Sequence, residues 1–173
     1  YVSAGRWELT DDGDWLWVSD YEWGHIPFHY GRWVWVSGVG WAWVPGRVYS
    51  HAWVTWRVGA DGYIGWAPLP PWYYWVGGYA YYHHHHHHAA YVFTHHHHVF
   101  HHHVHTHIIR DKAEVAKAAK ATRPYHEAHP KKAGTARKPA SPSLEEACVK
   151  NAPAKRSKGN AKAMEYMKPD AIK

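Results

Sequence analysis

Histidine is the residue type in this sequence that could most readily carry chemistry. Fifteen of the 20 histidines lie between His83 and His107, mostly in unbroken runs of three to six. The neutral imidazole is the commonest protein ligand for Zn²⁺, Cu²⁺ and Ni²⁺, so this stretch is a candidate metal-binding segment. The run at 83–88 lies in mid-chain and is followed by further histidines, so we interpret it as native sequence and not as a purification tag.

The end of this stretch, VFHHHVHTHII at 99–109, alternates in character and predicts a β-strand. Alternate residues of a strand share one face and lie about 6.6–6.8 Å apart, which suits metal binding between strands or chains better than a closed tetrahedral site. We expect no required cofactor, only a capacity to bind Zn²⁺, Cu²⁺ or Ni²⁺. The alternative is a His/Tyr-rich segment used for packing and for pH-dependent charge. The candidate metal ligands are His95, His97, His101, His103, His105 and His107.

The sequence contains none of the motifs that position a catalytic nucleophile, base or cofactor. HExxH, GxSxG, GxGxxG and phosphate-loop motifs are all absent, and no nearby Cys, Asp or Glu completes a metal-site geometry. Asp11, Asp12 and Asp14 fall in a predicted turn, where solvated carboxylates are the rule. We therefore predict that the protein is not an enzyme.

Tryptophan supplies the second distinctive pattern, because all 13 copies lie between Trp7 and Trp75. GRWELTDDGDWLWV begins at Gly5 and GRWVWVSGVGWAWV begins at Gly31, so that Gly, Arg and Trp recur at a constant offset of 26 residues. Repetition at a fixed period indicates one structural unit that is used more than once.

Each repeat predicts a β-hairpin, because apolar residues alternate on both sides of a turn-forming DDGD or SGVG. A looser third copy, HAWVTWRVGADGYIGWAPL at 51–69, carries GADG at its turn. Three hairpins give about six strands, whereas one hairpin alone would be marginal. We predict a mainly β fold: a small antiparallel sheet or a partly closed barrel, with a His-rich strand or loop, one short helix and an extended basic tail.

Composition divides the chain into four segments with different charge. The segments are a Trp-rich hairpin domain at 1–76, a Tyr/His-rich segment at 77–109, a short helix at 110–123 and a basic tail at 124–173. Residues 1–109 carry four Arg and seven acidic residues, whereas residues 110–173 carry 16 Lys or Arg and seven acidic residues. The tail therefore predicts nonspecific polyanion binding, with a solvated linker or an arm across a neighbouring subunit as the other interpretations.

The C-terminal half contains one clear predicted helix and one further candidate for a short helix. RDKAEVAKAAKA at 110–121 predicts the clear one, and SLEEACVKN at 143–151 predicts a second short one with Ser143 as its cap. The single cysteine, Cys148, excludes a disulfide within the chain. No run of about 18 apolar residues occurs, so no transmembrane segment is expected.

The recurrence of Trp at equivalent positions favours a packing role, since a small sheet has little core volume and an aromatic ring buries about 150–250 Å². Six short strands cannot cover 13 indoles, so the surplus predicts an exposed aromatic contact surface. Arg6 and Arg32 each stand beside a Trp and predict cation–π stacking across strands. The candidate interaction surface is Trp33, Trp35, Trp41, Trp43, Trp72, Tyr73 and Trp75.

Three stretches, YGRWVWVSGVGWAWVPGR, WVTWR with GYIGWAPLPP, and YVFTHHHHVFHHHVHTHIIRD, together resemble an uncharacterised family of bacterial, often myxobacterial, extracytoplasmic proteins. Members of that family often carry a FecR-like domain upstream of the Trp-rich repeats. The resemblance covers about residues 5–110 and implies export to the periplasm or cell surface and a β-rich repeat fold. It implies no activity and no catalytic residues.

Three functions remain open from the sequence. The first is a non-enzymatic structural or interaction protein of the cell envelope or surface, which assembles with copies of itself or with other envelope proteins by strand addition. The second is a glycan- or peptidoglycan-binding module that uses exposed Trp and Tyr. The third is a His-rich protein that binds transition metals.

Overall fold

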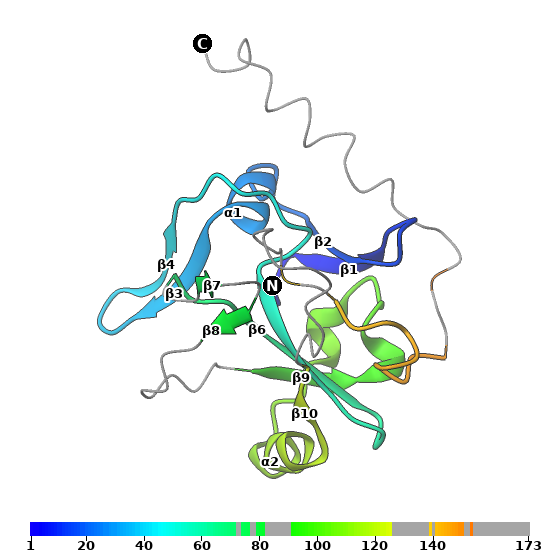
Figure 1. The fold of residues 1–173 in the computed structure, drawn as a ribbon. Helices are drawn as coiled ribbons and strands as arrows, with labels where there is room; N and C mark the ends of the chain where they lie inside the picture. The colour runs from blue at the N-terminus through cyan, green and yellow to red at the C-terminus, as the bar shows by residue number, and fades with distance from the viewer. Residues whose placement is uncertain are drawn as a thin grey trace.

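The fold is mainly β, as the sequence predicts, with small antiparallel sheets and few helices (Figure 1). No helix in the described part of the chain is long and apolar enough to cross a membrane. The computed structural model describes residues 1–71, 74–76, 79–81, 91–125, 139, 141–150 and 153.

Three β-hairpins occupy the positions that the repeat predicts. Their strands are β1 (Gly5–Leu9) with β2 (Trp15–Ser19), β3 (Arg32–Val36) with β4 (Gly40–Val44), and β5 (Val54–Val58) with β6 (Tyr63–Pro68). Each hairpin places two tryptophans directly opposite each other: Trp7 and Trp17, Trp33 and Trp43, Trp56 and Trp66. Gly13, Gly38 and Gly62 take positive φ in the three turns, a conformation that glycine adopts without steric cost.

The three hairpins do not join edge to edge within the described residues. β5 and β6 belong to a four-stranded sheet of order β10-β5-β6-β9, completed by β9 (Val92–His95) and β10 (Arg123–Pro124). β1–β2, β3–β4 and the pair β7 (Tyr74–Val76) and β8 (Tyr79–Tyr81) are separate two-stranded sheets. The partly closed barrel is therefore wrong, because the first and third hairpins meet through their large aromatic side chains and not through backbone pairing.

The predicted helix near residue 110 is confirmed as α2 (Lys112–Ala121). Asp111 caps it, because its carboxylate accepts a hydrogen bond from the Glu114 backbone N–H at 2.8 Å. A five-residue helix that the sequence did not indicate, α1 (His25–His29), lies between the first two hairpins.

The second predicted helix, at 143–151, is wrong. The reciprocal capping bonds do form: Ser143 N donates to the Glu146 carboxylate at 2.9 Å, and Glu146 N donates to Ser143 Oγ at 3.2 Å. The chain then makes turns only, since Cys148 adopts a φ of 55°, a left-handed conformation that a right-handed helix cannot include.

The predicted strand at 99–109 is also wrong, because this part of the chain forms turns and short 3₁₀ helices. The helices are η1 (His96–His98) and η2 (Val104–His107), and the strand of this region lies earlier, at β9. Val99 and Val104 are both fully buried, yet their separation of five residues would place them on opposite faces of a strand. Turning the chain lets both side chains reach the same core.

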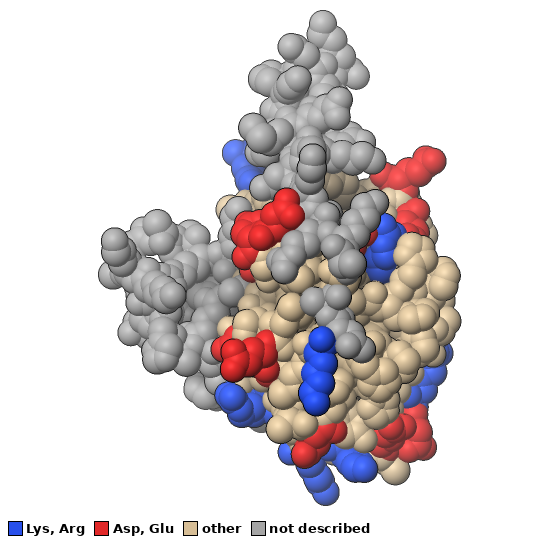
Figure 2. Space-filling view, turned by 90° about the vertical axis from the view of Figure 1, so that its right-hand side faces the viewer, with Lys and Arg blue, Asp and Glu red and all other residues tan. Residues whose placement is uncertain are grey.

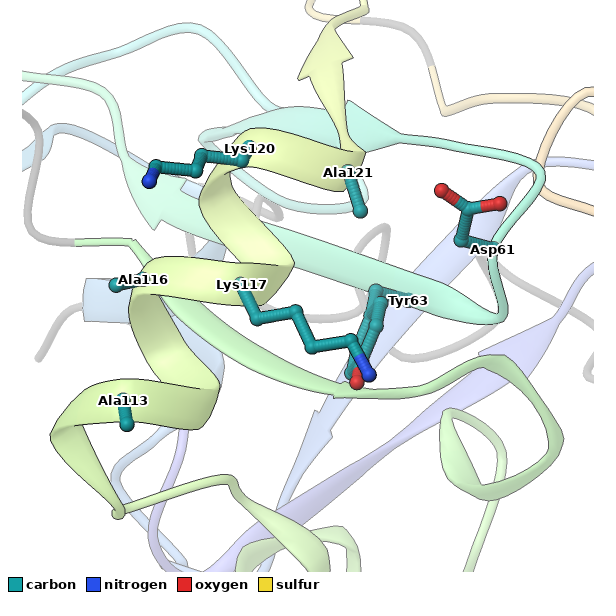
Figure 3. A pocket seen from close by; sticks show the side chains of 7 residues that line it. All are labelled: Asp61, Tyr63, Ala113, Ala116, Lys117, Lys120 and Ala121. Carbon is teal, nitrogen blue, oxygen red and sulfur yellow. The ribbon is translucent and has the colours of Figure 1, made fainter.

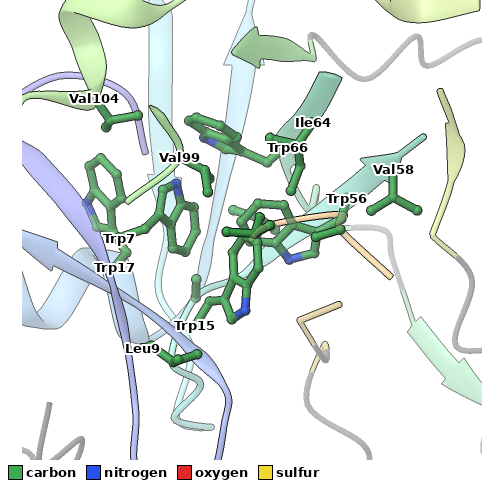
Figure 4. Close-up of a cluster of buried hydrophobic side chains, with 14 of the residues drawn as sticks. Trp7, Leu9, Trp15, Trp17, Trp56, Val58, Ile64, Trp66, Val99 and Val104 are labelled. Carbon is green, nitrogen blue, oxygen red and sulfur yellow. The ribbon is translucent and has the colours of Figure 1, made fainter. Parts of the chain in front are cut away.

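The core is built from indoles of the first and third hairpins (Figure 4). The ring centroid of Trp7 lies 5.2 Å from that of Trp17, 4.7 Å from Trp56 and 5.7 Å from Trp66. Trp15 packs against Trp56 at 4.9 Å. All these rings are almost fully buried, which confirms a packing role for the tryptophans of these two hairpins.

Part of the predicted tail, residues 141–150, packs on the domain itself. Ser141 Oγ accepts a hydrogen bond from Trp15 N at 2.8 Å, and Ala147 and Val149 belong to the main hydrophobic core. Most of the remaining tail lies outside the described residues. The core therefore draws on both halves of the chain.

Arg32 makes a cation–π contact, as predicted, but its partner lies just before β5 and not on a neighbouring strand. The Arg32 guanidinium lies 3.3 Å from the ring centroid of Trp53. The contact predicted for Arg6 is wrong, because Arg6 forms ion pairs with Glu8 at 2.6 Å and with Asp20 at 3.4 Å. Glu8 is two residues along the same strand, so its carboxylate shares a face with Arg6 and is the stronger partner.

Arg57 ties the four-stranded sheet to the end of α2. Its guanidinium donates to the carbonyl oxygens of Ala119 and Thr122 and to the Thr122 hydroxyl. We expect Arg57→Ala to lower the free energy of unfolding by about 2–3 kcal/mol, because hydrogen bonds from a charged donor are lost. Arg57→Lys should restore little of the lost stability, since an ammonium group cannot reproduce the planar arrangement of donors in the guanidinium group. Urea unfolding measures both variants, and a loss below about 0.5 kcal/mol for Arg57→Ala would contradict this role.

Candidate functional site

The β3–β4 hairpin carries a group of exposed apolar side chains and extends away from the rest of the fold at the left of Figure 1. We call residues 32–44 the exposed hairpin. Trp35 is 62% exposed, Trp41 is 48% exposed and Val39, at the turn, is 76% exposed. Two of the tryptophans predicted to form an interaction surface, Trp35 and Trp41, are therefore exposed to solvent.

The base of the exposed hairpin is anchored to the segment around α1. Trp33 Nε1 donates to Pro27 O at 2.9 Å, and Trp43 Nε1 donates to Tyr30 O at 2.8 Å. Both indoles are half-buried. The other two predicted interaction residues of this hairpin therefore hold its base in place, while its end remains uncovered.

The end of the exposed hairpin presents two indoles as a pair. Trp35 and Trp41 lie opposite each other across the strands, with ring centroids 5.6 Å apart and ring planes at 78°. The repeat position equivalent to Trp41 is Trp15, which is 1% exposed and packs against Trp56 and Phe100. The same repeat position is thus core in one hairpin and surface in the other.

The chemistry of the exposed hairpin is apolar. No charged residue occurs from Trp33 to Gly46, and Ser37 supplies the one hydroxyl of that stretch. Among the described strands β3 pairs with β4 alone, so each of the two strands has one edge that no other described strand covers. The exposed hairpin thus combines exposed apolar side chains with two strands that pair only with each other among the described strands.

The remaining predicted interaction residues are not placed on this surface. Trp72 and Tyr73 lie outside the described residues, and Trp75 is placed only as a strand position in β7. Sequence reasoning missed a second exposed pair, Tyr21 and Trp23, whose rings stack with centroids 4.6 Å apart; Trp23 is 59% exposed. Both lie between the first two hairpins, where the repeat carries no signal.

The histidines between β9 and α2 form a second cluster, which we call the histidine hub (residues 95–107). Ring centroids lie 5.6 Å apart for His95 and His97, 4.0 Å for His97 and His98, and 3.9 Å for His98 and His107. His101 lies 4.3 Å from His107. The hub brings together predicted metal ligands from separate runs, but it does so through turns and not along one face of a strand.

Two other predicted ligands lie farther along the hub. The ring of His103 is 6.4 Å from that of His101 and 5.9 Å from that of His105. The sequence pattern missed His98, because its ring contacts that of His107 only when the backbone between them turns. In the part of the chain that the structure describes, no three His, Cys, Asp or Glu side chains are already arranged around a common metal position.

The hub lowers the pKa values of several of its own histidines. For His96, His98 and His107 the largest cause is desolvation, and charge on the neighbouring imidazoles lowers the pKa further. These rings therefore gain a proton at a lower pH than an isolated histidine does.

The buried His29 and a partly exposed pair, His51 with Asp14, form polar contacts that were not expected from the sequence. His29 Nδ1 lies 3.0 Å from Ser50 O, which places the imidazole proton on Nδ1, and burial lowers the pKa of His29 to about 4. His51 Nδ1 lies 3.3 Å from the Asp14 carboxylate. The only sequence signal for these contacts was the spacing of His25 and His29, four residues apart and therefore on one side of a helix.

An open hollow of about 720 Å³ lies between α2 and the β5–β6 turn (Figure 3). Figure 3 shows Lys117 reaching toward Tyr63, whereas Lys120 extends away from it. Three of the seven lining residues are alanines of α2, and the other four are polar or charged. Its lining residues are Asp61, Tyr63, Ala113, Ala116, Lys117, Lys120 and Ala121.

Charged side chains of the described residues are interspersed on the face shown in Figure 2, with basic and acidic groups next to each other. A nucleic-acid-binding face instead gathers its Lys and Arg into one patch or stripe. This face of the described protein therefore offers no continuous basic surface.

The Trp-rich part of the chain has a counterpart among protein families. Residues 1–73 match a family of unknown function (DUF6600). The DUF6600 match includes all six strands of the three hairpins and ends before the histidine hub. No curated protein and no solved structure matches the chain. Over its Trp-rich part, the chain is thus similar to an uncharacterised family, and the match assigns no activity.

Proposed function

We propose that this protein is a non-enzymatic interaction protein of the cell envelope or surface and that it self-associates through the exposed hairpin. The observation that carries the proposal is the exposure of Trp35 and Trp41 on a hairpin whose base is anchored. Aromatic residues are enriched at protein interfaces, where a few of them supply most of the binding energy.

A second copy of the chain suits the exposed hairpin better than other partners do. The hairpin is uncharged from Trp33 to Gly46, so two copies can approach through it without repulsion between like charges. The free edges of β3 and β4 can each accept a strand of the partner. An edge and an apolar face in the same element are the two features that strand addition requires.

The available area sets the expected strength of this association. The exposed side chains of the hairpin present on the order of 500 Å² of apolar surface, less than the roughly 800 Å² per partner of a standard stable interface. We therefore expect weak, reversible self-association and not a permanent dimer.

A glycan suits this surface less well. Ligand sites for small polar molecules combine apolar contacts with a few converging polar groups, whereas this hairpin offers the hydroxyl of Ser37 alone. The ring planes of Trp35 and Trp41 also meet at 78°, so they do not form one flat stacking platform.

Location outside the cytoplasm is part of the same proposal. Its support is the resemblance of the Trp-rich repeats and the His-rich stretch to extracytoplasmic bacterial proteins that often carry a FecR-like domain. Binding of polyanions by the basic tail also remains a prediction.

Sedimentation velocity over a concentration series tests self-association. We expect the sedimentation coefficient of the wild type to rise with concentration and that of the Trp35→Ser/Trp41→Ser variant to stay at the monomer value. Trp23→Ser is the matched control, because Trp23 is also well exposed but lies outside the hairpin, and this variant should associate like the wild type.

Two results would contradict the proposal: a wild type that stays monomeric throughout, or a double variant that associates as the wild type does. If the monomeric wild type bound lipid vesicles or peptidoglycan fragments through Trp35 and Trp41, the partner of the hairpin would be a lipid or a glycan and not a second copy of the chain.

A further inference from the structure

Three histidines of the hub form a closed triangle. The ring centroids of His98 and His107 are 3.9 Å apart, those of His101 and His107 are 4.3 Å apart, and those of His98 and His101 are 6.2 Å apart. Three imidazoles bound to one Zn²⁺ at about 2.0–2.1 Å would have centroids roughly 5 Å apart. Two of the three separations are shorter than this value and one is longer, so the rings lie close enough together for side-chain rotation to bring their nitrogens to one ion.

The backbone that carries this triangle is held in place. Val99 and Val104, between the three histidines in sequence, are fully buried in the core. His101 N donates to His98 O at 2.9 Å, so the first two corners are linked through the backbone. The Thr94 hydroxyl donates to His107 O at 2.8 Å, which ties the third corner to β9. Only the rings would have to move to bind an ion.

The required movement is a rotation of side chains. The rings of His98 and His107 are stacked at 14°, so their nitrogens do not yet converge. His101 Nδ1 accepts a hydrogen bond from His103 N at 3.1 Å, and metal binding through this ring would give up that single exposed bond. His101 is exposed and the other two rings are partly exposed, so solvent leaves room for the rotation.

We propose that His98, His101 and His107 bind one transition-metal ion of the Zn²⁺, Cu²⁺ or Ni²⁺ class, with water completing its coordination. Imidazole nitrogens suit these ions, and the set contains no carboxylate or carbonyl that would favour Mg²⁺ or Ca²⁺. The ion would link η1 to η2, and the site does not depend on self-association through the exposed hairpin.

Calorimetric titration with Zn²⁺ at neutral pH tests the site. The titrations use a full-length chain in which His83–His88 are replaced by Ser, because six consecutive imidazoles bind such ions themselves. We expect one ion per chain, and we expect His98→Ala, His101→Ala and His107→Ala each to weaken binding by at least about tenfold. His102→Ala is the matched control, since His102 lies in the same loop outside the triangle, and it should bind as the parent does.

Two further measurements test the site even if one of the alanine variants folds poorly. The Cu²⁺ complex should show an electron paramagnetic resonance spectrum with three nitrogen ligands, and one of them should disappear in His98→Asn. Zn²⁺ should raise the thermal unfolding temperature of the parent but not of that variant. Equal, small losses of affinity for all four alanine variants, or uptake without saturation, would overturn the site.

Discussion

Trp15→Ala is expected to lower the free energy of unfolding by about 3–5 kcal/mol, the usual cost of removing a large aromatic side chain from a packed core. Trp15 is 1% exposed, and its ring packs at 4.9 Å against Trp56 and at 4.7 Å against Phe100. These neighbours belong to the third hairpin and the histidine hub, which other contacts also hold in place. The cavity left by the indole therefore cannot collapse completely, and urea unfolding followed by circular dichroism measures the loss.

Trp41→Ala is the matched control, because residue 41 occupies the same repeat position 26 residues later. Trp41 is 48% exposed, so its removal should change stability by less than about 0.5 kcal/mol. Trp15→Phe should cost less than Trp15→Ala, since it keeps an aromatic ring and removes a buried indole N–H that has no partner among the described residues. Equal losses of unfolding free energy for Trp15→Ala and Trp41→Ala would contradict the conclusion that Trp15 is a core residue and Trp41 a surface residue.

Acid should destabilise the protein through His29, by about 3 kcal/mol between pH 6.5 and pH 4. The pKa of His29 is lowered from 6.5 to about 4 in the folded state, mainly because the ring is buried. As the pH falls below 6.5, the unfolded chain takes up a proton that the folded protein does not. This stabilising contribution is therefore complete above pH 6.5 and is lost as the pH falls toward 4.

His29→Gln isolates this effect, because a glutamine amide can still donate to Ser50 O but does not titrate in this range. Unfolding free energies at several pH values should fall less steeply with acid for His29→Gln than for the wild type. Trp41→Ala, which removes an exposed side chain that does not titrate, is the control and should leave the slope nearly unchanged. A wild type that gains stability on acidification, or a variant with the same slope, would contradict the role of His29.

The hairpins were predictable from the sequence because the signals that form them are local. Alternation on both sides of a glycine-containing turn predicts each pair of strands without knowledge of the rest of the fold. The arrangement of the hairpins was not predictable in this way. Whether two hairpins meet by their edges or by their faces depends on side-chain packing between distant segments, such as Trp7 against Trp66.

The sequence predicts that some tryptophans form an exposed surface, but it does not predict which ones. The surplus of indoles predicts an aromatic surface, yet Trp15 and Trp41 occupy the same position in the repeat. Their different exposure comes from Phe100 and from residues 141–150, which lie near the first hairpin and far from it in the sequence. Trp33 and Trp43 were predicted as contact residues for the same reason, although hydrogen bonds to backbone carbonyls make them anchors.

In the histidine hub, assuming the two-residue period of a strand led to the wrong set of neighbouring histidines. A strand pattern places alternate histidines on one face and leaves out His98. Burial of both Val99 and Val104 requires a turn between them, and this turn carries His98 onto His107. The choice between a strand and a turn depended on the core, which the histidine spacing alone does not reveal.

Fluorine NMR of protein labelled with 5-fluorotryptophan tests self-association through the exposed hairpin most directly, because it reports on each indole separately. Signals are assigned with single Trp→Phe variants and followed as the protein concentration is raised. The signals of Trp35 and Trp41 should shift or broaden as copies associate, while those of the buried Trp7 and Trp66 stay unchanged. Signals of Trp35 and Trp41 that do not respond to concentration, or that respond no more than those of Trp7 and Trp66, would contradict the account.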